Sequence, residues 1–202
     1  MTKKNILLHV GCGPKNIINT PFKDKEHEWE EIRLDIDNKN NPDIVNSITE
    51  MHDVLDSSVN AVFSSHNIEH LYEYQVEIAL KEFLRVLKPE GFALITCPDL
   101  MSTCKLIVED KLNDIAYMSK AGGITPLDIL YGHRLSIKAG NEYMCHKTGF
   151  TKKTLTAYFM NAGFGTVATL SRSLNFDLWA LATKTKTDKD VLIKTANNYF
   201  PS

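Results

Sequence analysis

The 202-residue sequence has few cysteines and no long apolar run, and each shortage excludes a class of protein. The four cysteines include no Cys-x-x-Cys pair, and a chain of this length does not need disulfide staples, so we expect reduced thiols in a cytoplasmic protein. The apolar run near the N-terminus, residues 6–8, is too short for a signal peptide or a membrane span. The sequence therefore predicts no membrane partner.

The sequence also lacks a surplus of basic residues. It contains 23 Lys and Arg against 25 Asp and Glu, and beyond the first residues no basic cluster is longer than Lys152-Lys153. Nucleic-acid binding depends chiefly on clustered cations that neutralise phosphates, so we expect no nucleic-acid partner. The hydrophobic content of 43% is sufficient for a full core, and the length fits a single domain.

Glycine is sparse, but two of the ten glycines, Gly11 and Gly13, directly follow the apolar run at residues 6–10. The run is short and rich in aliphatic residues, which favours a strand buried on both faces. Glycine has no Cβ, so the backbone can turn sharply there or approach a ligand closely. The pattern fits a strand that enters a nucleotide-binding loop, although an ordinary tight turn fits Gly-x-Gly equally well.

Apolar segments and turn residues predict strands and helices in alternation along the chain. We expect strands at residues 6–10, 31–37, 43–46, 59–65, 92–97, 165–170 and 176–183. We expect helices at residues 74–88, 100–109 and 151–163, whereas residues 16–30 are polar and weakly periodic, so any helix there is short or irregular. This order implies a mostly parallel sheet with helices on both faces, in which ligands bind beyond the carboxyl ends of the strands.

Two segments do not fit this alternation. Residues 110–149 are rich in glycine, tyrosine and histidine, and the segment is too long for a simple connection, so we expect it to be functional or to carry its own small helices. The tail from residue 184 is polar and lysine-rich with a short apolar patch at residues 191–193, and we assign it no element.

The glycine loop differs from a dinucleotide-binding fingerprint. The third glycine of that fingerprint would fall at position 16, which is Asn16, and Pro14 removes a backbone N–H that a pyrophosphate would need. A nucleoside without phosphate needs only close approach to the glycines and a carboxylate for the ribose hydroxyls. Asp35, at the tip of the second strand, has the right spacing for that role.

Four longer stretches carry a family resemblance. They are HVGCGP at 9–14, LDID at 34–37, VNAVFSSHNIEHL at 59–71 and FLRVLKPEGFALITCPDL at 83–100. The chain resembles a class I S-adenosylmethionine-dependent methyltransferase, specifically a small, stand-alone, methyltransferase-11-like member. The resemblance implies an α/β fold in a single domain: a Rossmann-like, doubly wound, mostly parallel seven-stranded sheet with an antiparallel last strand. It also implies a domain at 1–184 with a substrate-capping insertion at about 110–149, and a polar C-terminal tail at 185–202.

The resemblance further implies S-adenosyl-L-methionine as cofactor and S-adenosyl-L-homocysteine as product. Gly11 and Gly13 would face the methionine part, Asp35 the ribose, and Ile36 the adenine. Ser47 stands where the family often has an acidic residue near the adenine amine. The full set of expected cofactor-binding residues is Gly11, Cys12, Gly13, Asp35, Ile36, Ser47, Ile48, Ser65 and His66.

Histidines supply the candidates for acid–base chemistry. We interpret His9, inside the first strand, as a buried imidazole with a hydrogen-bond partner. Histidine is the side chain most easily poised as a base near neutral pH, so we expect His133 or His146, and next His66, to take the acceptor's proton. Tyr131, Tyr143 and Asp99 are the expected acceptor-binding residues. We expect a small, polar O- or N-nucleophile as acceptor, and a monomer or homodimer.

Two alternatives remain at this point. The first is a protein that binds the cofactor without catalysis. The second is a zinc hydrolase, because His66-x-x-Glu69-His70 matches the inverted zinc-protease pattern. We favour Glu69 and His70 as hydrogen-bonded residues at a helix start, and we expect no metal.

Overall fold

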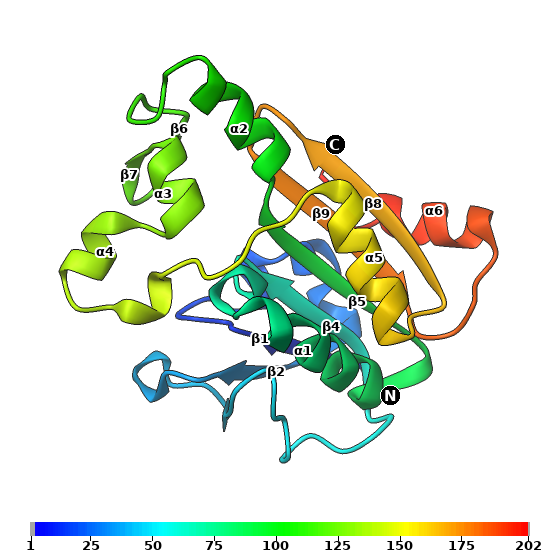
Figure 1. Ribbon diagram of the computed structural model, residues 1–202. Helices are drawn as coiled ribbons and strands as arrows, with labels where there is room; N and C mark the ends of the chain where they lie inside the picture. Colours follow the sequence, from blue (N-terminus) through cyan, green and yellow to red (C-terminus); the bar gives the residue numbers. More distant parts are fainter. Residues whose placement is uncertain (1–2, 202) are drawn as a thin grey trace.

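A seven-stranded sheet forms the centre of the computed structural model, which describes residues 3–201. The strand order is β3-β2-β1-β4-β5-β9-β8 (Figure 1). The strands are β1 (Asn5–Val10), β2 (Trp29–Asp35), β3 (Ile44–Val45), β4 (Val59–Ser65), β5 (Leu87–Pro98), β8 (Thr166–Arg172) and β9 (Asp177–Thr183). β9 is antiparallel to both of its neighbours, and the other pairings are parallel. The predicted fold class is confirmed.

Two of the predicted helices, α1 (Glu73–Val86) and α5 (Lys152–Ala162), cover one face of this sheet. The third, α2 (Leu100–Val108), follows the end of β5. Leu80 and Phe83 of α1 pack with Phe159 of α5 in the larger apolar cluster, and all three are fully buried. α1 ends two residues earlier than predicted because Leu87 already pairs with Val59 of β4.

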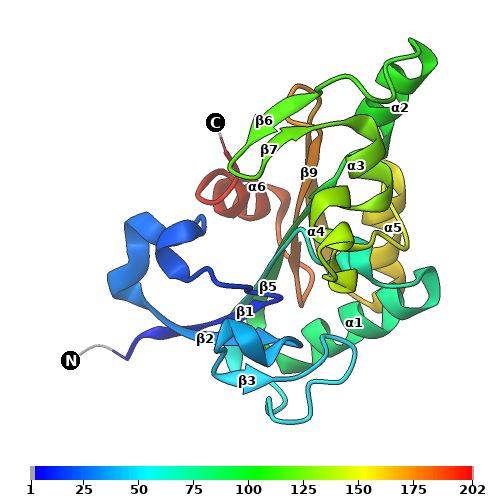
Figure 2. The same cartoon turned by 90° about the vertical axis from the view of Figure 1, so that its left-hand side faces the viewer.

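The opposite face carries less helix. Between β1 and β2 every residue is described, and the segment forms only the 3₁₀ turns η1 (Ile17–Asn19) and η2 (Lys23–Glu28), as its weak periodicity predicts. The C-terminal tail forms helix α6 (Lys189–Asn197) on the same side, opposite α1 and α5 (Figure 2). α6 belongs to a second apolar cluster, in which Leu192 and Tyr199 pack with Phe22 and Phe92. The tail thus covers part of the sheet face opposite α1 and α5, where the segment between β1 and β2 forms only short 3₁₀ turns.

The segment at 110–149 follows α2, beyond the end of β5 (Figure 1). It folds into a hairpin and short helices: β6 (Tyr117–Ser119), β7 (Gly122–Ile124), α3 (Pro126–Tyr131), α4 (Arg134–Lys138) and η5 (Glu142–Met144). Two further 3₁₀ turns, η3 (Asn38–Asn40) and η4 (Ile68–His70), follow β2 and β4. Within residues 3–201, no helix has both the length and the apolar character that crossing a membrane requires.

Candidate active site

The glycine loop after β1 needs both of its glycines. Gly11 and Gly13 have φ of +59° and +54°, in the left-handed region that side chains rarely adopt. Gly11 also lies against Asn67, because a Cβ at position 11 would come within 2.3 Å of the Asn67 side chain. The loop therefore approaches the turn after β4 closely, and a side chain on Gly11 would push the two apart.

Asp35 joins this loop to the tip of β2. Its carboxylate accepts hydrogen bonds from Gly13 N at 2.7 Å, Asp37 N at 2.8 Å and Asn40 Nδ2 at 3.2 Å. Only 7% of Asp35 is exposed. A carboxylate has about four acceptor sites, so one remains for a ligand hydroxyl.

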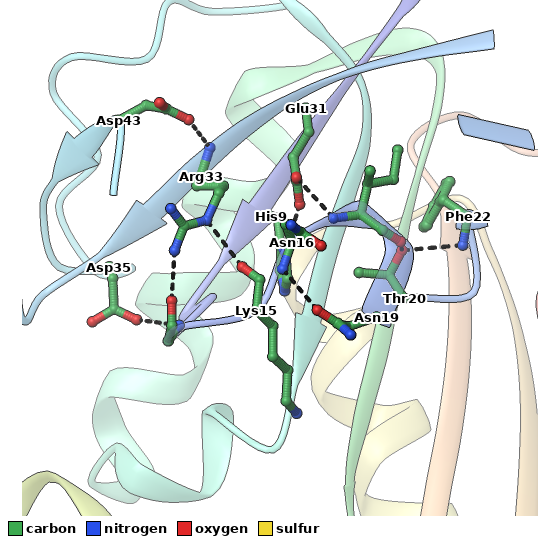
Figure 3. Close-up of polar contacts among 12 residues, drawn as sticks. His9, Lys15, Asn16, Asn19, Thr20, Phe22, Glu31, Arg33, Asp35 and Asp43 are labelled. Atoms are coloured by element: carbon green, nitrogen blue, oxygen red, sulfur yellow. Dashed lines mark hydrogen bonds and ion pairs between the residues drawn. The ribbon is translucent and has the colours of Figure 1, made fainter. Parts of the chain in front are cut away.

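Arg33 and Glu31, both in β2, also hold the loop and the segment after it in place (Figure 3). The Arg33 guanidinium donates to the backbone oxygens of Gly13 and Lys15, at 2.7 and 2.9 Å. His9 Nδ1 lies 2.8 Å from Glu31 Oε1, which confirms the interpretation of His9 as a partnered buried imidazole. The second Glu31 oxygen accepts from Ile17 N. The loop is consequently fixed on the sheet before any ligand binds.

A cavity of about 380 Å³ opens beside this loop, and we call it the first cavity. Of the predicted cofactor-binding residues, it is lined by Gly11, Gly13, Asp35, Ile36, Ser47, Ile48 and His66. Cys12 and Ser65 lie outside it. Cys12 is 2% exposed, and burial raises the pKa of its thiol to about 11, while Ser65 Oγ accepts from Thr96 Oγ1. The sequence did not single out Asn40, Asn67 and Lys147, which also line the cavity.

A second cavity, of about 270 Å³, adjoins the first, and the two share His66, His70 and Met144. It lies under the segment at 110–149. Its lining includes His133 and His146, two of the predicted bases, together with Tyr117 and Asp128, which the sequence analysis did not identify. Arg134 donates to the Asp128 carboxylate, and although burial opposes ionisation, such donors hold the pKa of Asp128 well below its ordinary range.

None of the three predicted acceptor-binding residues lines the second cavity. Tyr143 lines the first cavity, and Tyr131 is 62% exposed and lines neither cavity. Asp99 is 2% exposed and caps α2, accepting from Met101 N and Ser102 Oγ and from Ser171 Oγ across the sheet. The geometry therefore gives Asp99 a structural role rather than a contact with an acceptor.

Glu69 and three histidines meet where the cavities join. Glu69 is 1% exposed, and His66 Nδ1 lies 3.4 Å from its Oε1. Burial opposes ionisation of Glu69, but the neighbouring histidines, His66 above all, outweigh burial and hold the pKa of this carboxyl below its ordinary value. Burial lowers the pKa of His146 and favours its neutral form. The expectation of hydrogen bonds holds for His70, which bonds to Cys145 O, but not for Glu69, whose oxygens have no hydrogen-bond partner within residues 3–201.

Comparisons with known proteins agree with this geometry. Residues 8–95 match a family model described as a methyltransferase domain, and a sequence comparison with curated proteins gives no match. A SAM-dependent methyltransferase from Archaeoglobus fulgidus has 17% identity and a TM-score of 0.59, over 89% of this chain and 86% of its own.

Two other solved structures are similar at comparable levels. The 1,6-didemethyltoxoflavin-N1-methyltransferase of Burkholderia thailandensis, with bound 1,6-didemethyltoxoflavin and S-adenosylhomocysteine, has 12% identity and a TM-score of 0.57, over 91% of this chain and 72% of its own. The CMeT domain of the citrinin polyketide synthase has 14% identity and a TM-score of 0.60 over 92% of this chain, which spans 48% of that structure's chain. The family match over residues 8–95, the strand order and the similar structures agree: the chain has the methyltransferase fold, and the cofactor of the proteins that share it is S-adenosylmethionine.

Proposed function

We propose that the protein transfers the methyl group of S-adenosylmethionine to an oxygen or nitrogen atom of a small polar molecule. The observation that carries this proposal is the pair of adjoining cavities. The first is bordered by the glycine loop and Asp35, which suit a nucleoside with an amino-acid tail, and the second is lined by histidines. The cofactor occupies the first cavity and the acceptor the second, so the methyl group lies at their junction beside His66 and His70.

The chemistry needs little more than alignment and a base. Methyl transfer is an in-line displacement at the carbon of a sulfonium, so the protein must align two molecules and exclude water. A hydroxyl or protonated amine must also lose a proton, and a positioned base contributes a factor of roughly 100 to 10,000. His66, His133 and His146 all line the second cavity and are our candidates for that base. Tyr131 and Asp99 are left out of the proposed acceptor contacts.

The size of the second cavity favours a small acceptor. At about 270 Å³ it lies near the lower end of the range for small-molecule sites. The 1,6-didemethyltoxoflavin-N1-methyltransferase, whose fold is similar, holds the small molecule 1,6-didemethyltoxoflavin together with S-adenosylhomocysteine. Both observations support a metabolite rather than a macromolecule as acceptor.

Calorimetric titration with S-adenosylhomocysteine tests the cofactor assignment. We expect binding by the wild-type protein and a loss of at least about tenfold in affinity for Asp35→Asn, whose amide cannot accept from Gly13 N and a ribose hydroxyl in the same way. Asp114→Asn is the matched control, because Asp114 is exposed and lies outside both cavities. Equal affinities in all three proteins would contradict the assignment.

A screen of small hydroxyl and amine metabolites with methyl-labelled cofactor tests the transfer itself. We expect at least one labelled product and a fall of about a hundredfold or more in its rate when the histidine that acts as base is replaced by Ala. Unchanged rates in His66→Ala, His133→Ala and His146→Ala would exclude a histidine base. Binding of S-adenosylhomocysteine without any transfer across the screen would favour a cofactor-binding protein.

A further inference from the structure

Glu69, His70 and His146 converge on one point of the second cavity. One potential ligand atom from each residue lies within 4.8 Å of the others. The imidazole rings of His70 and His146 have centroids 5.0 Å apart, at an angle of 59°. Glu69 and His70 come from η4, whereas His146 comes from the segment between η5 and α5. The fold therefore brings together two imidazoles and a carboxylate from distant parts of the chain.

Both imidazoles are oriented by backbone carbonyls. His70 Nδ1 lies 3.1 Å from Cys145 O, and His146 Nδ1 lies 2.8 Å from Ile129 O. A carbonyl can only accept, so each Nδ1 carries a hydrogen, and in the neutral imidazole Nε2 then has the lone pair that a metal ion needs. This orientation is the one that metal-binding histidines adopt, with one ring nitrogen bonded to a carbonyl and the other on the ion.

Glu69 supplies a buried charge without a donor. Its carboxylate is 1% exposed, it lines the second cavity, and neither oxygen accepts a hydrogen bond from any described residue. A buried carboxylate normally has several donors, because removal from water is costly. The His66 imidazole, at 3.4 Å, makes no hydrogen bond with Glu69, and that side chain is 45% exposed. The unpartnered oxygens and the two lone pairs of the imidazoles form one donor set.

The backbone around His146 is held firmly in place. Lys147 N and Thr148 N both donate to Glu69 O, at 2.8 and 3.2 Å, and His146 N donates to Tyr131 O. Gly132, at φ +95°, lies so close that a Cβ would come within 1.8 Å of Met144 O. These contacts fix the distance between η4 and His146 without help from a ligand, which is what a preformed site requires.

We propose that Glu69, His70 and His146 bind one divalent transition-metal cation, and among these ions we select Zn²⁺. Two imidazoles with one carboxylate form a known catalytic ligand set for Zn²⁺ and related first-row ions, whereas Mg²⁺ and Ca²⁺ prefer ligand sets made of oxygen alone. Three protein ligands leave coordination positions open, and the cavity adjoins them. The site differs from the hydrolase pattern because His146 replaces His66 as the second imidazole ligand.

The role of the cation rests on the proposed function. Held by Glu69, His70 and His146, the cation would polarise the hydroxyl group of the acceptor and lower the pKa of that hydroxyl. His133, which lines the same cavity, takes the hydroxyl proton. The oxygen then attacks the methyl carbon as the carbon–sulfur bond breaks, and the bonding electron pair stays on sulfur, which gives S-adenosylhomocysteine and the methyl ether. In this scheme His146 is a ligand, and the base is His133.

Direct metal binding tests the site without any activity measurement. The full-length protein is treated with a chelator, desalted and titrated with ZnCl₂ by calorimetry. We expect one equivalent to bind, with affinity reduced at least about tenfold in Glu69→Gln, His70→Asn and His146→Asn. His133→Asn and the exposed His52→Asn should bind as the wild type does. Substitution with Co²⁺ should give visible d–d absorption in the wild type and lose it in the three ligand variants.

Titration of every variant with S-adenosylhomocysteine separates the two proposals. Zn²⁺ binding that is equal in the wild type and in all three ligand variants, or absent from a wild type that still binds S-adenosylhomocysteine, would overturn the metal site and leave the methyltransferase proposal intact. Mg²⁺ binding as tight as Zn²⁺ binding would overturn the choice of ion. Normal S-adenosylhomocysteine affinity in Glu69→Gln and His146→Asn shows that these two variants are folded. His70 also lines the first cavity, so an unchanged melting temperature is the folding control for His70→Asn.

Discussion

Gly13 is held at both ends of its peptide unit. Asp35 Oδ2 accepts from its N–H at 2.7 Å, and Arg33 Nη2 donates to its carbonyl at 2.7 Å (Figure 3). Arg33 also donates to the carbonyls of Asn40 and Asn41, in the turn that follows β2. One guanidinium thus ties the glycine loop to the turn beside it, and these two segments border the first cavity.

Arg33→Lys should weaken S-adenosylhomocysteine binding about tenfold. An ammonium is a point charge with a different reach, and it cannot reproduce several planar donor contacts at once. The carbonyls of Gly13 and Lys15 would then lose their donor, and the loop would have to be ordered by the ligand. Calorimetric titration measures the change.

Arg85→Lys is the matched control for this substitution. Arg85 also binds backbone carbonyls, those of Met51 and Val54, but it lies away from the first cavity. We expect Arg85→Lys to lower the free energy of unfolding and to leave the affinity for S-adenosylhomocysteine unchanged. Equal affinities in wild type and Arg33→Lys would show that the loop needs no support from the guanidinium.

Single residues at strand ends were only partly predictable from the sequence. Asp35 lines the first cavity because a carboxylate at the tip of β2 reaches the loop after β1, and its contact with the ribose stays a prediction. Asp99 was expected to bind the acceptor, yet it directly precedes α2 and caps it. An Asp just before a helical segment is a capping signal, and it could have been read from the sequence. The proximity of His146 to Glu69 could not be predicted from the sequence, because it depends on how the segment at 110–149 folds back.

The C-terminal element is the part of the fold that sequence reasoning missed. The apolar patch at residues 191–193 is too short to reveal an amphipathic helix by itself, and its partners lie at the other end of the chain. Tyr199 packs against Phe22 with ring centroids 4.6 Å apart and against Phe92 at 5.2 Å. Because η1 and η2 are short, this face of the sheet depends on α6 for its cover.

Tyr199→Ala should therefore lower the free energy of unfolding by about 3 kcal/mol, as expected for removal of a buried aromatic ring. Val191→Ala, in α6 but 53% exposed, should change it by less than about 0.5 kcal/mol. Urea denaturation measures both values. A small effect of Tyr199→Ala would mean that α6 contributes little to the second apolar cluster.

The raised pKa of Tyr199 leads us to expect a loss of stability at alkaline pH. Burial, with a smaller effect of Glu28, raises the pKa of Tyr199 from 10.0 to about 12. The folded state therefore favours the protonated phenol, so this contribution is complete below about pH 10 and is lost as the pH rises towards 12. Tyr199→Phe should match the wild type at neutral pH and lose less stability above pH 10. Parallel pH curves for the two proteins would contradict the assignment.

At the scale of the whole molecule, the sheet could be predicted and the segment at 110–149 could not. Buried aliphatic runs specify strands whatever surrounds them, and parallel strands separated by helices leave few possible orders. The segment has short elements that depend on turns such as Gly132 and on caps such as Thr125, so its path depends on contacts rather than on periodicity. That path brings Tyr143, Met144 and Lys147 to the first cavity as well as His146 to the second.

Cofactor binding should therefore slow amide exchange both in the loops of the sheet and in the segment at 110–149. Hydrogen–deuterium exchange with saturating S-adenosylhomocysteine should slow not only at residues 11–13 and 35–37 but also at residues 141–147, because the first cavity is closed on one side by the segment. Binding at 100 times Kd should also stabilise the fold by about 2.7 kcal/mol, measurable as a higher melting temperature. In Asp35→Asn both effects should be reduced together. Protection confined to the loops of the sheet would show that the segment at 110–149 does not close over the cofactor, and that the second cavity is reached independently of the first.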